Sequence, residues 1–138
     1  MQKLAGLAAL FLATTCYGYG DAYRGDDLYR ISLINLIATP EKYHNKKVRV
    51  IGAGRLEFEG NAICLSKDDI VHRISNNCLW ISVDPESIRA TQEKLEELNG
   101  KYVLIEGVFN SENTGHMGMN SGAIESINRY DLWERSRP

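Results

Sequence analysis

The chain has 138 residues, of which 43% are hydrophobic and 25% are charged, with 12 glycines and three prolines. This composition excludes a disordered or collagen-like chain, and the length is enough for one domain with its own core but hardly for two. The formal net charge of −2 gives no electrostatic reason to expect a polyanionic partner, because phosphate binding draws on a net basic surface. Nucleic acid is therefore disfavoured as the main partner.

The first 20 residues have the pattern of a secretory signal peptide. Lys3 supplies a positive charge, and residues 4–13 contain no charged side chain. This apolar run is too short to span a bilayer. Gly18 and Gly20 place small residues before Asp21, where we expect cleavage, although a cut a few residues earlier suits the pattern as well. The alternative is a buried N-terminal helix; we predict an exported protein, periplasmic or secreted, with no transmembrane span in the mature chain.

Cys16 offers a second way to process the leader, because an acylated cysteine here would make the chain a lipoprotein. The preceding residues 13–15 lack the branched apolar residue and the small residue of a usual lipobox, so this lipid anchor is the minor alternative. Beyond the signal peptide at 1–20, we expect a flexible N-terminal segment at 21–30 and a single domain at 31–134.

The first predicted element of that domain is a short helix. Ser32 is placed to cap it, and its apolar residues Leu33, Leu36 and Ile37 lie on one face. Pro40 ends the helix, because the proline ring excludes the preceding residue from the helical region.

The period of the pattern then changes to two. Residues 47–50 alternate between apolar and polar side chains, residues 56–59 alternate again, and Gly52 and Gly54 lie between them. A small closed barrel needs its first strand bent so that it can belong to two sheets, and glycine permits such a bend. We predict one long strand bent at these glycines, followed by a two-residue hairpin turn at Gly60-Asn61.

Four more strands and a helix follow. The second strand is predicted at residues 62–66 and the third at 78–83, with a short helical turn between them that Asp68 or Asp69 caps and that runs through Ile74. The next element is one amphipathic helix that stops at Asn99-Gly100, with Asp84 as N-cap, Pro85 at the first position, and inward-facing residues at Ile88, Thr91, Leu95 and Leu98. The last two strands are predicted at 102–109 and 123–127, joined by a Gly-rich loop at 110–122.

This order predicts a mainly β fold with one main helix. Three strands, a helix and two strands form the sequence of elements of the OB-fold, a five-stranded Greek-key barrel whose helix lies between the third and fourth strands. A different α+β barrel or roll, with the same elements and other pairings, is the alternative.

Three segments carry a resemblance to a known group. Residues 36–43, 47–52 and 100–109 are similar to exported bacterial proteins of the OB-like, anticodon-binding-like group, and the similarity runs from Ile31 to Trp133. Its most recognisable pieces are a strand pattern of the form gKyV-x-v-x-G, which occurs twice, and Gly115-His116-Met117-Gly118 in the last loop. The resemblance implies an OB-like fold and export, and it assigns no catalytic residue.

Cys64 and Cys78 are candidates for a disulfide, because an exported protein folds in an oxidising compartment. If the second and third strands are antiparallel and the two cysteines face each other, Ala62 lies opposite Trp80. The bond would close a loop of about 15 residues, which the chain-entropy model values at roughly 3 kcal/mol. Two buried thiols are the alternative.

Four side chains are candidates for ligand binding: Trp80, Arg49, Arg55 and His116. Trp80 is predicted to project away from the core side of its strand, toward the surface that OB-folds use for ligands. An indole there can stack on a ring of the ligand. The alternative is that it packs under the loop before the third strand and covers the disulfide. The two arginines would continue a basic strip with Lys46 and Lys47, or else belong to a mixed solvated surface.

Metal and cofactor signals are weak. His116, Met117 and Met119 are soft ligands of the kind that suit Cu(I), but three such residues on one loop are a weak pattern, and we predict no metal site. The run Val48–Gly54 mimics the start of a dinucleotide-binding fingerprint, yet Glu57 stands where the third glycine is needed, so no cofactor is predicted. Haem is not predicted either. Exported OB-like haem chaperones use a His-x-x-x-Tyr arrangement, and Asn120 stands where His116 would need a tyrosine partner.

The function predicted from the sequence is that of an exported, non-enzymatic OB-like binding domain. Its ligand is expected to be a protein or a small polar molecule that contacts the second and third strands and the loop at 110–122. A hydrolase or transferase with an unrecognised site near His116 is one alternative, and a single-stranded nucleic-acid binder is another.

Overall fold

The computed structural model of the protein describes residues 27–134. The predicted signal peptide, its cleavage site and Cys16 lie outside this range. Within it, no helix is long and apolar enough to cross a bilayer. The strands are β1 (Tyr29–Arg30), β2 (Lys47–Arg55), β3 (Ala62–Cys64), β4 (Cys78–Ile81), β5 (Tyr102–Asn110) and β6 (Ala123–Leu132). The helices are α1 (Leu33–Ala38), α2 (Lys67–Val71), α3 (Pro85–Ile88) and α4 (Gln92–Leu98), with 3-10 turns η1 (Pro40–Lys42), η2 (Ser75–Asn77) and η3 (His116–Gly118).

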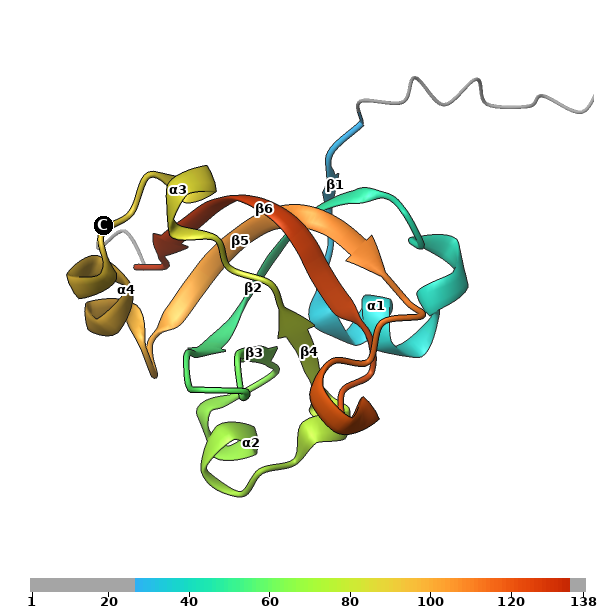
Figure 1. The fold of residues 1–138 in the computed structure, drawn as a ribbon. Coiled ribbons are helices and arrows are strands. Elements are labelled where there is room, and N and C mark those ends of the chain that lie inside the picture. Colours follow the sequence, from blue (N-terminus) through green and yellow to red (C-terminus); the bar gives the residue numbers. More distant parts are fainter. Residues whose placement is uncertain (1–26, 135–138) are drawn as a thin grey trace, which may run out of the picture.

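Five of the strands close into a barrel (Figure 1). The hydrogen-bonded order is β2-β3-β4-β6-β5, and β5 pairs again with β2. All pairs are antiparallel except β4 with β6. Ala53 is where β2 changes partner, because it pairs with Cys64 on one side and Tyr102 on the other. The prediction of a mainly β, five-stranded OB-like barrel is confirmed.

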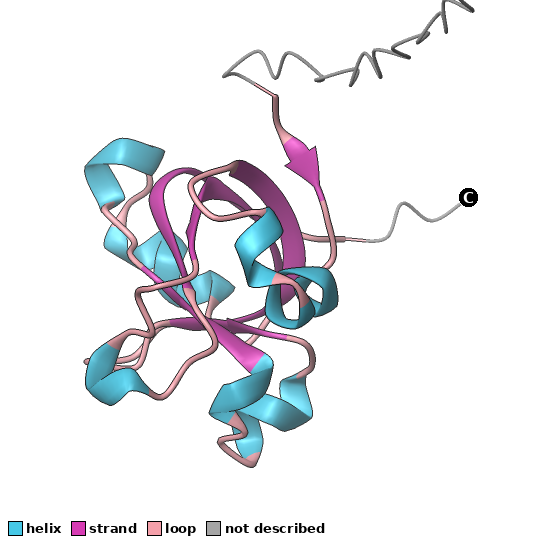
Figure 2. Ribbon diagram, turned by 90° about the vertical axis from the view of Figure 1, so that its right-hand side faces the viewer, coloured by secondary structure: helices cyan, strands magenta, loops and turns pink. Residues whose placement is uncertain are grey.

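The core lies inside this barrel. Val48, Ile81 and Val103 from three different strands are fully buried and belong to one cluster, to which α4 adds Leu95 and Leu98. In Figure 2 the strands curl around a common centre and the helices lie around them. The helical segment between the third and fourth barrel strands therefore contributes to the core, as the OB-like arrangement requires.

The two glycines of β2 are required by close packing. A Cβ on Gly52 would lie 2.6 Å from Leu33 Cδ1 and 2.7 Å from the Cys64 carbonyl oxygen. A Cβ on Gly54 would lie 2.6 Å from the Tyr130 hydroxyl. These positions flank Ala53, where the strand leaves one partner for another, which agrees with the predicted role of the glycines at the corner of the barrel.

The predicted hairpin between the first two barrel strands is wrong in its details. β2 ends at Arg55, so residues 56–59 are not a strand, and the connection is a six-residue loop instead of a two-residue turn. The backbone of Leu56 pairs with the side chain of Asn99, which accepts from its N–H at 2.9 Å and donates to its C=O at 3.1 Å. Because these backbone groups are already satisfied, the alternating pattern does not continue as a ladder.

The predicted single helix between the third and fourth barrel strands is also wrong, since it is two short helices. Asp84 and Pro85 begin α3 as expected, but Arg89 adopts a left-handed conformation and ends it. Thr91, expected on the apolar face, instead caps α4 by accepting a hydrogen bond from the Lys94 N–H. A threonine hydroxyl competes with the helix for backbone donors, and here it starts a new helix.

Three smaller differences concern the ends of elements. The cap of α2 is Ser66, not Asp68 or Asp69, and Asp69 completes a capping box with it. β1 was not predicted, and it places Tyr29 and Arg30 in parallel pairing with β2. β6 continues to Leu132, five residues beyond the predicted end.

Candidate ligand-binding surface

The predicted disulfide joins β3 to β4. Cys64 and Cys78 are bonded, their Cα atoms lie 4.0 Å apart, and both are buried. The register pairs Cys64 with Cys78 and Ala62 with Trp80, as predicted. Ile70 of α2 packs against the cluster that contains the bond. The disulfide is therefore a structural link that fixes the strand carrying Trp80.

A hollow of about 200 Å³ lies between the 56–61 loop and the 111–122 loop, and we call it the loop hollow. It is at the position where OB-folds bind ligands, between the loop joining strands one and two and the loop joining strands four and five. It brings together three of the four predicted site residues, Arg55, Trp80 and His116. Its other lining residues are Glu57, Phe58, Glu59, Gly60, Arg73, Ser75, Met119 and Asn120.

The 111–122 loop passes directly over part of Trp80. A Cβ on Gly115 would lie 2.7 Å from Trp80 Cβ and 2.8 Å from two atoms of its indole, and Gly115 has a φ of +71° that favours glycine. In Figure 1 this orange-red loop lies beside β4. Trp80 is half-buried and lines the loop hollow. The alternative interpretation expected the loop before β4 to pack on Trp80. The loop that packs on it instead follows β5.

Arg55 holds the 56–61 loop in place. Its side chain is only 7% exposed, and its Nε donates to the Gly60 carbonyl at 2.7 Å. The same nitrogen lies 4.0 Å from Glu57 Oε2. Arg55 thus lies at the loop hollow but satisfies the backbone of the loop, so its contribution to the site is to position Glu57 and its neighbours.

Two carboxylates of the 56–61 loop face side-chain nitrogens from other segments. Glu57 Oε2 lies 3.7 Å from Arg73 Nη1, and Glu59 Oε2 lies 3.6 Å from His116 Nε2. The second contact joins the two loops across the hollow. Both distances exceed the 2.7–3.2 Å of a good N–H···O hydrogen bond, so these carboxylates keep capacity to accept further bonds.

Asn120 is a polar residue that no sequence motif selects as a site residue. It is 8% exposed and lines the loop hollow, and its Oδ1 has no hydrogen-bond partner in the described part of the chain. Its Nδ2 donates to the Thr114 carbonyl at 3.5 Å. A buried acceptor without a partner costs about 1–3 kcal/mol, so the hydrogen bonding of Asn120 is incomplete in the fold.

Three exposed apolar side chains of the two loops form what we call the apolar rim: Phe58, Met117 and Met119. Phe58 and Met119 line the loop hollow, and Met117 lies in the sequence between its lining residues His116 and Met119. Phe58 is 93% exposed and Met117 is 82% exposed. His116 and Met119 line the hollow but Met117 does not, so the three weak metal candidates do not share it. Across residues 27–134, no group of three or more His, Cys, Asp or Glu side chains could hold a metal ion.

Arg49, the fourth predicted site residue, lies elsewhere. Its Nε and Nη2 both contact Glu106 Oε1 at 2.6 Å on the outer face of β2 and β5. Arg129 Nη1 contacts the same oxygen at 3.0 Å. Since Arg49 is neutralised there and Arg55 is buried, the predicted basic strip does not form one free cationic surface.

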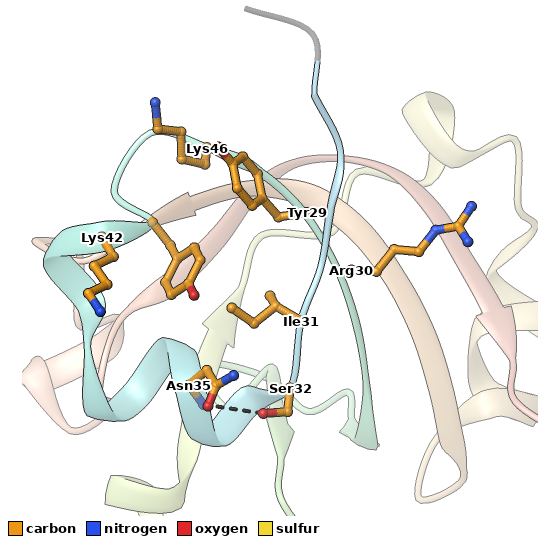
Figure 3. A pocket seen from close by; sticks show the side chains of 8 residues that line it. Tyr29, Arg30, Ile31, Ser32, Asn35, Lys42 and Lys46 are labelled. Carbon is orange, nitrogen blue, oxygen red and sulfur yellow. Dashed lines mark hydrogen bonds between the residues drawn. The ribbon is translucent and has the colours of Figure 1, made fainter. Parts of the chain in front are cut away.

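A larger hollow, of about 570 Å³, lies between β1 and the helices α1 and η1 (Figure 3). Figure 3 shows Ile31 pointing into it, whereas Arg30 points away, and Tyr43 is among its lining residues. The Tyr29 and Tyr43 rings meet edge to face at 5.9 Å. In the hydrogen bond drawn there, Ser32 Oγ accepts from the Asn35 N–H, and it caps the N-terminus of α1. None of the four predicted site residues is among the residues that line this larger hollow.

Comparisons with known proteins add little to this description. No family model matches the chain, and no curated protein matches it in sequence. One similar solved structure, described as an aspartyl-tRNA synthetase from Leishmania major Friedlin, has a TM-score of 0.43 and 12% identity. The match covers 91% of this chain and 23% of that one, so this chain spans less than a quarter of the other protein's length. At this TM-score the likeness carries no argument about function.

Proposed function

We propose that the protein is an exported protein-binding domain whose partner contacts the loop hollow and the apolar rim. The observation that carries the proposal is the exposure of the apolar rim, of which Phe58 and Met119 line the same hollow as Trp80. Aromatic and methionine side chains are enriched where proteins bind each other, and methionine adapts its shape to a partner.

The size of the loop hollow favours a protein over a small molecule. Sites for small molecules usually measure about 300–1,000 Å³, whereas this one holds about 200 Å³. That volume suits one inserted side chain, with the rest of the contact made over the surrounding loops. The apolar rim supplies exposed surface for such a contact.

Two features of the loop hollow disfavour the two alternative functions, a nucleic-acid binder and a hydrolase. A phosphate backbone would meet the carboxylates of Glu57 and Glu59, which line the hollow and would repel it. A hydrolase would need a nucleophile bonded to a base. Ser75 lines the hollow, but within residues 27–134 no hydrogen bond joins it to His116, whose Nε2 faces Glu59.

Export is supported by two independent features. Residues 1–20 have the pattern of a signal peptide, and the Cys64–Cys78 disulfide is the kind of bond that persists in oxidising compartments.

Site-specific photo-crosslinking tests the proposal. A benzophenone amino acid replaces Phe58 in one variant, Met117 in a second, and Ile34 of α1 in a control, since Ile34 is also an exposed apolar residue. We expect a covalent adduct of one defined mass from positions 58 and 117 but not from position 34. Adducts of equal yield from all three positions, or none from the rim, would contradict the proposed function.

A further inference from the structure

We propose that the outer face of the barrel binds a small amphiphilic anion, a free alkyl chain that ends in a carboxylate. The site is a hollow of about 480 Å³ on β2 and β5, beside the end of β1 and the residue that follows β6, and we call it the outer groove. It shares no lining residue with the loop hollow, so it goes beyond the proposed function and does not depend on it.

The floor of the outer groove is apolar although it lies on the outside of the barrel. Val48 and Val50 of β2 are buried in the core, and because side chains alternate along a strand, Arg49 and Ile51 point outward. Ile51 pairs across the strands with Leu104 of β5, and both line the groove. The solvated face of an antiparallel sheet is usually polar, so this apolar pair favours a contact with an apolar ligand.

Trp133 extends this floor. Its backbone N–H donates to the Tyr102 carbonyl at 2.8 Å, so the pairing with β5 continues one residue beyond β6 and fixes the start of the indole side chain. Trp133 is 46% exposed and Ile51 is 40% exposed, and both line the groove. The volume of about 480 Å³ lies within the range of about 300–1,000 Å³ usual for small-molecule sites, whereas the loop hollow is smaller.

The two charged residues that line the outer groove are both arginines. Arg49 is neutralised, because its Nε and Nη2 contact Glu106 Oε1 at 2.6 Å. Arg30 is exposed, and within residues 27–134 its guanidinium has no hydrogen bond and no ion pair. Figure 3 shows that it points away from the hollow beside α1, and it lines the outer groove instead. The groove therefore has one uncompensated positive charge.

An alkyl carboxylate matches the outer groove with both of its parts. The chain would cover Ile51, Leu104 and Trp133, and removal of apolar surface from water is the main driving force for such binding. The carboxylate would accept two parallel N–H bonds from the Arg30 guanidinium, a geometry that carboxylates and arginine share. A polyanion matches less well because only one charge is uncompensated, and an amphiphilic cation would be repelled.

Nuclear magnetic resonance titration of the protein with three probes tests the proposal. Octanoate has the chain and the charge, octanamide has the same chain without the charge, and acetate has the charge without the chain. The Trp133 indole N–H reports the outer groove, and the Trp80 indole N–H reports the loop hollow as an internal control. We expect octanoate to shift the Trp133 signal alone, to bind about tenfold more tightly than octanamide, and acetate to cause no shift.

Several results would overturn the proposal. Equal affinities for octanoate and octanamide would show that no charge is recognised. Equal shifts at both indoles, or shifts that begin only where octanoate forms micelles, would show non-specific adsorption. Signals that broaden with protein concentration and ignore octanoate would show that a second copy of the chain covers this face.

Variants separate the contributions of charge and apolar contact. Arg30→Gln should remove the preference for octanoate and leave the octanamide affinity unchanged, whereas Lys94→Gln on α4 removes a positive charge from another exposed site and should preserve the preference. Ile51→Thr should weaken both probes by about fivefold, and Ile34→Thr, at an exposed apolar residue of α1, should weaken neither. If Lys94→Gln acts like Arg30→Gln, octanoate senses only net charge, and the outer groove is not its site.

Discussion

Two buried polar side chains of this small barrel have opposite surroundings. Asp69 at the start of α2 is 6% exposed, and its carboxylate accepts bonds from the Ser66 N–H at 2.9 Å, the Ser66 hydroxyl at 2.7 Å and Asn77 Nδ2 at 2.8 Å. Asn120 in the 111–122 loop is 8% exposed, and its Oδ1 has no partner in the described range. The two residues are therefore buried to a similar extent, but the hydrogen bonds of Asp69 are complete and those of Asn120 are not.

Asp69 and Asn120 also differ in their place in the fold. The Asp69 network lies beside the disulfide, in the segment between β3 and β4 that the bond closes. Asn120 lines the loop hollow together with Glu57 and Glu59, whose carboxylates accept no hydrogen bond within the described residues. Tyr130 shows that an unpartnered atom alone is not a site, because its hydroxyl is also unpartnered but it does not line the loop hollow. Asn120, unlike Tyr130, belongs to the lining of the hollow that we propose as the binding site.

Removing the disulfide should have the largest effect on stability. The double variant Cys64→Ala/Cys78→Ala should lose about 3 kcal/mol of unfolding free energy, because the unfolded chain regains the freedom of a 15-residue loop. Urea denaturation followed by tryptophan fluorescence measures the loss. A loss below about 1 kcal/mol would show that the disulfide adds little to the stability of the segment that contains Asp69.

Asp69→Asn should destabilise the protein by about 2 kcal/mol. The amide that replaces the carboxylate loses charge-assisted bonds to Ser66 and leaves the Asn77 donor poorly matched. The same urea titration measures the change. Asp68→Asn is the control, since the neighbouring carboxylate is exposed; equal losses in the two variants would contradict a special role for the Asp69 network.

The contribution of Asp69 should depend on pH. Hydrogen bonds from Asn77 and then Ser66 hold the pKa of this carboxyl below its usual value, despite the opposing effect of burial. Because the folded pKa is depressed, the stabilisation is present above the unfolded pKa of about 3.9 and is lost as the pH falls through the folded pKa. The difference in unfolding free energy between the native protein and Asp69→Asn should shrink below about pH 4. A difference that stays constant down to pH 2 would contradict this origin.

Asn120→Leu should have the smallest effect, within about 1 kcal/mol of the native stability. It removes a long hydrogen bond to Thr114 together with the unpartnered acceptor, and replacing such a group by an apolar one of similar shape is close to neutral. A stability loss as large as that of Asp69→Asn would show that Asn120 serves the fold and not the site.

Local patterns were enough to predict most of the barrel. Alternation located the strands, the glycines of β2 marked its corner, and a single pairing assumption about Cys64 and Cys78 produced the observed register with Ala62 opposite Trp80. The errors arose where side chains distant in sequence satisfy the backbone. Asn99 pairs with Leu56 and ends a predicted strand, and the Thr91 hydroxyl divides a predicted helix.

The candidate site was only partly predictable, for the same reason. Trp80, Arg55 and His116 were selected from the sequence, and they meet at the loop hollow. The contact of Gly115 with Trp80 and the missing partner of Asn120 depend on how the 111–122 loop crosses β4, which no local pattern encodes. Arg49 was selected by charge alone, and Glu106 of another strand neutralises it.

Amide hydrogen exchange of the protein, alone and with its crosslink-identified partner, tests most directly whether the two loops form the binding surface. We predict slower exchange in residues 56–61 and 111–122 when the partner is bound, with residues 85–99 of the α3–α4 segment unchanged. Protection confined to residues 85–99, with both loops exchanging as in the free protein, would contradict the account.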